Sequence, residues 1–165
     1  AIWDGVRQVT DRALDRLLQM RENEGERLKE DILQRAGKII SIVGKIEERS
    51  PQTVAEYQQK LQERLNEMLK DSSFDEQRVL TEAAIFADKV AVAEETVRLR
   101  SHFDQLRMML DSSEAIGRKL DFLVQEMNRE ANTIGSKACD AQIAYMVVDI
   151  KAEIEKIREQ IQNIE

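Results

Sequence analysis

Three side chains have types and spacings that fit metal-assisted or acid–base chemistry. Glu126 and Glu130 are four residues apart, so on a helix their carboxylates share one face and could hold a hard cation such as Mg²⁺ or Mn²⁺. His102 is the only histidine in the chain, and histidine is the side chain that ordinarily changes charge near neutral pH. These residues are therefore the candidate catalytic group, with His102 as general acid or base.

Ordinary packing explains the same residues. Each glutamate could pair with a neighbour such as Arg129 or with a cation on an adjacent helix, as charged side chains on helices usually do. Glu95, Arg98 and His102 fall on one helical face, where a carboxylate could orient the imidazole or where His102 could simply bond to a neighbouring helix. Spacing alone leaves both alternatives open.

A polar seam in the segment GRKLDFLVQEMNREANTIGSKACD, residues 117–140, is the second unusual feature. Apolar residues recur there at spacings of three and four, which predicts a helix. A second set at the same spacings carries carboxylate, amide and hydroxyl groups: Asp121, Gln125, Asn128, Asn132 and Ser136. Glu and Lys usually fill such a face, so it either fixes helix register as a buried network or binds a ligand such as RNA.

Composition argues for long helices. The chain has 165 residues, of which 35% are charged and 4% aromatic, with one Pro and six Gly. A sheet protein of this size needs more turn residues and more β-branched or aromatic residues. The net charge of −7 counts against a simple basic nucleic-acid patch, because Lys and Arg supply phosphate contacts.

Several classes of protein are excluded or disfavoured. A single cysteine, Cys139, permits no disulfide within the chain and favours a reducing, cytoplasmic compartment. No apolar run approaches the ~18–20 residues of a membrane helix. A glycine-rich phosphate loop, a nucleophile elbow and a zinc-binding cysteine pair are all missing from the sequence. The chain begins AIWDGV, without Met or a signal peptide, which suggests an internal cut in a longer protein.

The apolar periodicity predicts where the helices lie. One helix is expected over residues 4–49, with apolar stretches on either side of the polar segment RENEGER. Ser50 and Pro51 suit the start of a second helix, which would reach residue 70. Further helices are expected over residues 75–90 and 93–111, after breaks at KDSSFDE and in KVAVAEE.

The last predicted helical stretch runs from Gly117 to the C-terminus, where Gly135 could bend it or break it in two. Its second part carries β-branched residues at alternating spacings of four and three, which is typical of coiled-coil packing: Ile143, Val147, Ile150, Ile154, Ile157, Ile161 and Ile164. We therefore predict an all-α, elongated antiparallel bundle of about five to six long helices. A coiled-coil-like helix ends this bundle, and the whole chain, 1–165, forms a single helical domain.

Four motifs make the chain resemble a known family. They are MRENEGERL at 20–28, RLRSHF at 98–103, GRKLDFLVQEMNREANTIGSKA at 117–138 and IEKIREQIQNIE at the C-terminus. Together they closely resemble the C-terminal half of the YicC-like proteins, a bacterial family of stress-associated endoribonucleases about twice this length. The resemblance implies a ring-like homo-oligomer that binds RNA and cuts it with the help of a divalent metal, Mg²⁺ or Mn²⁺.

The resemblance also implies roles for individual residues. Glu95 joins Glu126 and Glu130 as a candidate metal ligand. The candidate RNA-binding residues are Arg21, Arg98, Arg118, Lys119, Gln125, Asn128, Arg129, Asn132 and Lys137. On this interpretation the amide seam helps to line an RNA channel, and the basic residues contact phosphates.

A rival interpretation is a non-catalytic module that oligomerises or braces a catalytic half elsewhere in the protein. The acidity, the heptad-like tail and the lack of a sharp active-site motif all favour it. It predicts that this chain alone neither binds nor cleaves RNA, whereas the first interpretation places active-site residues within it.

Overall fold

The computed structural model describes residues 2–70, 76–90, 92–112 and 116–163. Within these ranges every regular element is an α-helix, so the predicted all-α class is confirmed. The helices are α1 (Ile2–Lys70), α2 (Glu76–Val90), α3 (Val92–Leu110), α4 (Gly117–Lys137) and α5 (Ala141–Ile161). The predicted breaks at residues 71–75, near residue 91 and at 113–115 lie outside the described residues.

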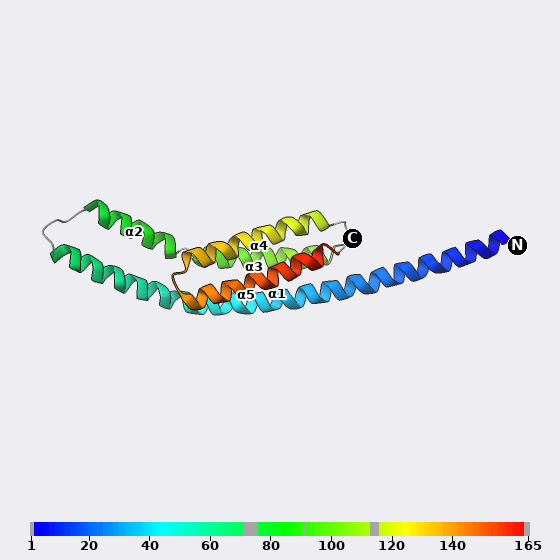
Figure 1. The fold of residues 1–165 in the computed structure, drawn as a ribbon, viewed down its shortest axis with the longest axis horizontal. Helices are drawn as coiled ribbons and strands as arrows, with labels where there is room; N and C mark the ends of the chain where they lie inside the picture. The colour runs from blue at the N-terminus through cyan, green and yellow to red at the C-terminus, as the bar shows by residue number, and fades with distance from the viewer. Residues whose placement is uncertain (1, 71–75, 91, 113–115, 164–165) are drawn as a thin grey trace.

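Four helix segments form the bundle that carries the core. The middle of α1 packs against α3 and α5, and α4 packs against the same two helices from the other side. Each helix runs antiparallel to both of its neighbours (Figure 1). The coiled-coil-like stripe of the last helix is buried from Ile143 to Ile161, between α1 and α4, whereas its predicted last member, Ile164, lies outside the described residues. The predicted antiparallel, elongated architecture is thus confirmed.

Ion pairs between helices tie α1 to its neighbours. Arg100 of α3 donates to both carboxylate oxygens of Glu47 at 2.9 and 2.6 Å, which holds the pKa of Glu47 below its usual range. Arg35 donates to Glu153 of α5 at 3.1 Å. These contacts set the register of α1, because they fix which turn of each partner helix it meets.

The N-terminal part of α1 projects beyond the bundle as a single helix (Figure 1). Residues 2–27 are exposed throughout, including the Trp3 side chain at 77%. The first apolar stretch of the predicted helix is therefore exposed, whereas the second, from Ile32 to Ile46, is buried in the core. The spacing of apolar residues is the same in both stretches, so it does not show which of them is buried.

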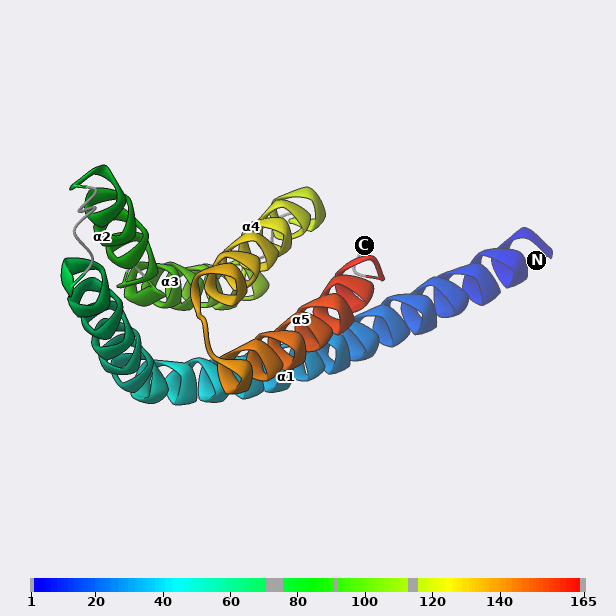
Figure 2. The ribbon, with the colours of Figure 1, turned by 60° about the vertical axis from the view of Figure 1, so that its left-hand side comes forward.

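Ser50 and Pro51 do not begin a new helix, so the predicted boundary is wrong. Helix α1 continues through Pro51 to Lys70. Proline removes one backbone hydrogen bond and bends a helix without necessarily ending it, provided that contacts on both sides hold the turns in place. Ile46 is buried before the proline, and Tyr57 stacks on Phe86 of α2 after it, with ring centroids 6.0 Å apart. Figure 2 shows α1 bending where it leaves the bundle toward α2.

The last helical stretch breaks three residues after the glycine that was expected to bend or break it. Gly135 stays inside α4, and the chain becomes extended at Ala138. Asp140 then caps α5 by accepting a 2.9 Å hydrogen bond from the backbone N–H of Ile143. The capping carboxylate thus fixes the boundary, because it satisfies a helix-start N–H that would otherwise lack a partner.

No described helix combines the length with the apolar character that crossing a bilayer requires.

Asp140 provides a test of how α5 is anchored. The Arg49 guanidinium, 2.9 Å away, and the N–H of Ile143 hold the pKa of Asp140 below its usual range. The ionised carboxylate therefore stabilises the fold above about pH 4, and this stabilisation is lost as pH falls through the lower pKa of the folded state. We expect Asp140→Asn, which can still cap the helix, to be less stable than the parent at pH 7, with the difference shrinking as pH falls toward and through the lowered pKa of the folded state.

Asp140→Ala removes both the charge and the cap, so it should lose about 1 kcal/mol more than Asp140→Asn at both pH values. Urea unfolding followed by circular dichroism measures all three proteins. A difference between the parent and Asp140→Asn that stays constant from pH 7 to pH 3 would contradict this account.

Candidate metal and nucleic-acid site

The candidate catalytic residues come together where α3 faces α4. The two helices are antiparallel, so Arg98 and His102 of α3 lie opposite Glu130 and Glu126 of α4, one turn apart on each helix. One potential ligand atom from each of His102, Glu126 and Glu130 lies within 4.8 Å of the other two. His102 lies 24 positions before Glu126 and 28 positions before Glu130 in the sequence, and the pairing of α3 with α4 brings the three side chains into one cluster.

Arginines already neutralise both glutamates. The Glu130 side chain is only 3% exposed, and its Oε2 lies 3.3 Å from Arg98 Nε. Arg129, on the outer surface, reaches Glu126 at 3.3 Å and Glu130 at 3.8 Å. The structure therefore combines the two arrangements that spacing left open: the carboxylates share a face beside His102, and each also has a cationic neighbour.

Glu95 lies outside this ligand cluster. Its side chain is 2% exposed, and its Oε1 accepts hydrogen bonds of 3.0 Å from both Arg98 and Lys137. Arg98 thus joins Glu95 of its own helix to Glu130 of α4. Arg98 and Lys137, two predicted RNA-binding residues, have their cationic groups directed at buried carboxylates.

The donor set of the cluster suits a divalent cation. Nδ1 of His102 is buried and makes no hydrogen bond to any described residue, and the Glu95 carboxylate that was expected to orient the ring pairs with Arg98 and Lys137 instead. Buried ring nitrogens usually have a hydrogen-bond partner. Because this nitrogen has none among the described residues, it is available to bind a metal or to relay a proton. Two carboxylates and an imidazole are ligands that Mn²⁺ accepts, and carboxylates suit Mg²⁺.

An open cleft of about 430 Å³ adjoins the cluster between α3 and α4. His102 and Glu126 lie on its wall, so cluster and cleft form one continuous surface. Arg118 and Lys119 line the same cleft from the first turn of α4, and both are exposed. These two predicted RNA-binding residues therefore line the same cleft as His102 and Glu126 of the candidate catalytic group.

Arg21 lies elsewhere. It lines an open hollow of about 830 Å³ beyond the end of the bundle, with Gly25 of α1 and with Gln160 and Asn163 at the C-terminal end of α5. Lys29 pairs with Asp111, and at 1.5 Å per residue along α3 and then α1 the backbone of Arg21 is about 25 Å from that of His102. Arg21 is too distant to act at the same phosphate as the cluster.

The amide seam lies on the opposite edge of α4 from the two glutamates. A Cβ on Gly135 would stand 3.2 Å from Val147 of α5, so this edge of α4 faces α5. Asn128, seven residues earlier, shares that edge and is half-buried, whereas Gln125 and Asn132 are exposed. Glu130 instead faces α3, so the seam and the cluster do not line one surface.

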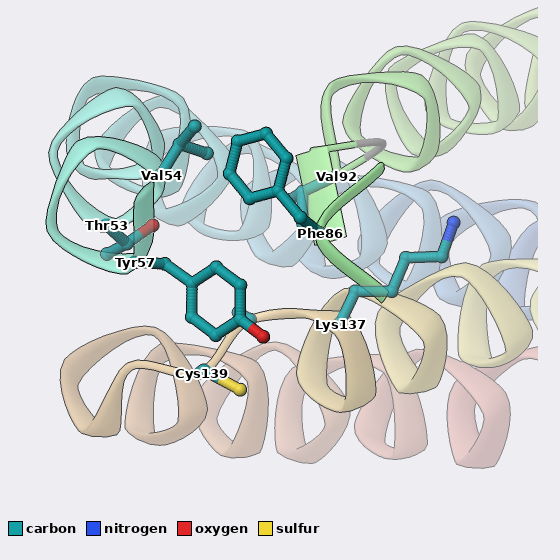
Figure 3. A pocket seen from close by; sticks show the side chains of 8 residues that line it. Thr53, Val54, Tyr57, Phe86, Val92, Lys137 and Cys139 are labelled. Carbon is teal, nitrogen blue, oxygen red and sulfur yellow. The ribbon is translucent and has the colours of Figure 1, made fainter. Parts of the chain in front are cut away.

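A third hollow lies where the bend of α1 meets α2 and the end of α4. Figure 3 shows the stacked rings of Tyr57 and Phe86 around it, together with Lys137 and Cys139. Its volume of about 20 Å³ holds roughly one water molecule. It is too small for a nucleotide and belongs to the packing of this junction.

Sequence reasoning missed two residues of the site. Phe122 lines the cleft with its side chain 65% exposed, and Glu94 pairs with Arg98 at 3.1 Å. Phe122 falls outside the apolar seam of residues 120–134, and an aromatic residue away from the buried face was the available signal. No sequence signal distinguishes Glu94 from the other surface glutamates.

Fold and site together define an all-α bundle with a histidine–carboxylate cluster beside a cleft with basic residues on its wall. The model of the family "Endoribonuclease YicC-like, C-terminal" matches residues 46–165, and the chain belongs to this family.

Two similar proteins are named "Probable endoribonuclease YicC". One, from Clostridioides difficile, is 48% identical over 99% of this chain and 56% of its own length. The other, from Haemophilus influenzae, is 39% identical over 100% of this chain and 57% of its own length. The chain therefore spans about half the length of these relatives.

The Arg98 contacts give a prediction about stability. Arg98→Ala leaves the buried carboxylates of Glu95 and Glu130 without their shared cation, which should lower the free energy of unfolding by about 2–3 kcal/mol. Arg129→Ala is the matched control, because Arg129 is 66% exposed and its ion pairs should contribute less than about 0.5 kcal/mol. Urea unfolding measures both, and equal losses would show that Arg98 has no special structural role.

Proposed function

We propose that this chain is the helical part of a metal-dependent endoribonuclease and that it supplies the catalytic cluster. The observation that carries the proposal is the convergence of His102, Glu126 and Glu130 from two antiparallel helices, with ligand atoms within 4.8 Å of one another. Family membership and the names of the relatives support endoribonuclease chemistry as the class of reaction. The substrate is RNA, and the hydrolysed bond is an internal phosphodiester.

Glu126 and Glu130 would hold the cation through their carboxylate oxygens. A bound divalent cation stabilises the negative charge that develops on the scissile phosphate. His102 lies beside them and transfers a proton to or from a reacting oxygen. Glu95 acts at a distance, because its hydrogen bonds to Arg98 and Lys137 fix the arginine that orients Glu130.

Arg118 and Lys119 would contact the phosphates next to the cleavage position, because they line the cleft that ends at His102 and Glu126. Arg129 lies on the outer surface of α4 beside both glutamates, where a third phosphate can reach it. Gln125, Asn128 and Asn132 remain predicted RNA contacts; a strand reaching them has to cross the outer face of α4. The chain's net charge of −7 makes these local cations the source of electrostatic attraction.

Cleavage of labelled RNA by the full-length protein tests the proposal. We expect His102→Ala, Glu126→Gln and Glu130→Gln each to lower the rate with Mn²⁺ by at least about 100-fold, which is the usual contribution of a positioned acid–base group or metal ligand. Glu155→Gln is the control, because Glu155 is a half-exposed carboxylate on α5. Gel filtration confirms that each variant keeps the oligomer size of the parent. Undiminished cutting by all three variants would place the active site elsewhere in the protein.

A second candidate function, an oligomerisation module, is favoured by the exposed face of α1. Large apolar side chains follow the projecting helix at helical spacings: Ile2, Trp3, Val6, Val9, Leu14, Leu17, Leu18 and Met20. The charged residues among positions 2–21 are three acidic and four basic, so two copies of the helix would not repel each other. We infer that a second copy of the chain covers this face, which is compatible with catalysis at the cluster.

The double variant Val9→Lys, Leu17→Lys should lower the molar mass of the full-length protein in solution, because it places cations in the apolar stripe. The control, Gln8→Lys with Gln19→Lys, adds the same charge at exposed polar positions and should leave the mass unchanged. Light scattering after gel filtration measures both. If the stripe variant kept the parent's mass, this contact between copies would be ruled out.

A further inference from the structure

Part of the wall of the cleft beside the cluster is apolar, and the proposed function gives its residues no role. Met109 of α3 and Phe122 and Leu123 of α4 form this wall. Leu123 belongs to the buried core, whereas Phe122 is 65% exposed. The cleft volume of about 430 Å³ lies in the range of pockets that hold small ligands or nucleoside-sized groups.

The chemistry of the cleft fits a nucleobase. An unpaired base has two apolar faces that stack on aromatic rings and a polar edge that forms hydrogen bonds. Phe122 offers the ring, and the amide of Gln105 on α3, which also lines the cleft, offers a donor and an acceptor. Arg118, four residues before Phe122 on α4, adds a cation for the attached phosphate.

An apolar side chain from a protein partner fits the same space less well. Such a partner would cover the exposed Arg118 with an uncharged surface, and burying a charge that gains no partner there is costly. A nucleotide satisfies both requirements at once, because its base fills the apolar wall and its phosphate meets the cations. The cleft also continues directly to His102 and Glu126, where the chain would be cut.

We propose that this cleft is a base-binding subsite in which Phe122 stacks on an unpaired nucleobase adjacent to the scissile phosphate. The inference rests on the proposed function and deepens it, because it specifies single-stranded RNA as the substrate. Bases of an intact duplex are stacked on each other and cannot enter the cleft. The base held there positions the neighbouring phosphate at the cluster.

Two substitutions of Phe122 separate stacking from packing, and both leave the core untouched because the side chain is exposed. Phe122→Leu keeps an apolar side chain without an aromatic ring, and we expect its KM for a labelled single-stranded RNA to rise about tenfold. Phe122→Trp keeps the ring, and its KM should stay within about twofold of the parent. Tyr145→Leu is the control: Tyr145 is an exposed aromatic residue on α5 and should have no effect.

A series of RNA oligonucleotides with one abasic position gives a second readout in the full-length protein. Removing the base next to the cleavage position should weaken cutting by the parent as much as Phe122→Leu does, and should add little in that variant. Unchanged KM in Phe122→Leu, with cutting still abolished in His102→Ala, would overturn the subsite and leave the proposed function standing. A parent protein that cuts no RNA would overturn both, and a changed oligomer size in Phe122→Leu would assign the cleft to a protein contact.

Discussion

Arg98 places one guanidinium between two almost fully buried carboxylates, Glu95 on its own helix and Glu130 on α4. Buried carboxylates without a cation are costly, so α3 and α4 can pack only in the register that brings both to the arginine. That register sets His102 opposite Glu126 one turn further along. The geometry of the candidate site is therefore a consequence of how two buried charges are neutralised.

Much of the fold could be predicted from the sequence, because the spacing of apolar residues indicates which face of a helix is buried. The stripe from Ile143 to Ile161 is buried as its spacing indicates. Boundaries were less predictable where one local signal competed with distant contacts. Pro51 does not end α1, because Tyr57 packs on Phe86 of α2 beyond it. Asp140 rather than Gly135 sets the break before α5, because its carboxylate also meets Arg49 from a distant segment.

The site was only partly accessible to sequence reasoning. Spacing along one helix placed Glu126 and Glu130 on a common face, since helical geometry is local. Their proximity to His102 depends on the pairing of two helices, which no spacing within either helix reveals. Glu95 shares a helical face with His102, yet its carboxylate bonds to Arg98 and Lys137. Contacts between helices thus decide which of several plausible carboxylates belongs to the cluster.

A divalent cation bound between α3 and α4, as proposed above, can be located by iron-mediated cleavage of the backbone. Fe²⁺ can replace Mg²⁺ or Mn²⁺ at such sites, and with ascorbate and peroxide it generates hydroxyl radicals that cut the backbone nearby. Mass spectrometry of the full-length protein then locates the cuts. We expect cuts near His102 in α3 and between Glu126 and Glu130 in α4, both lost in the double variant Glu126→Gln, Glu130→Gln. Cuts confined to other segments, or a pattern unchanged in the double variant, would contradict this expectation.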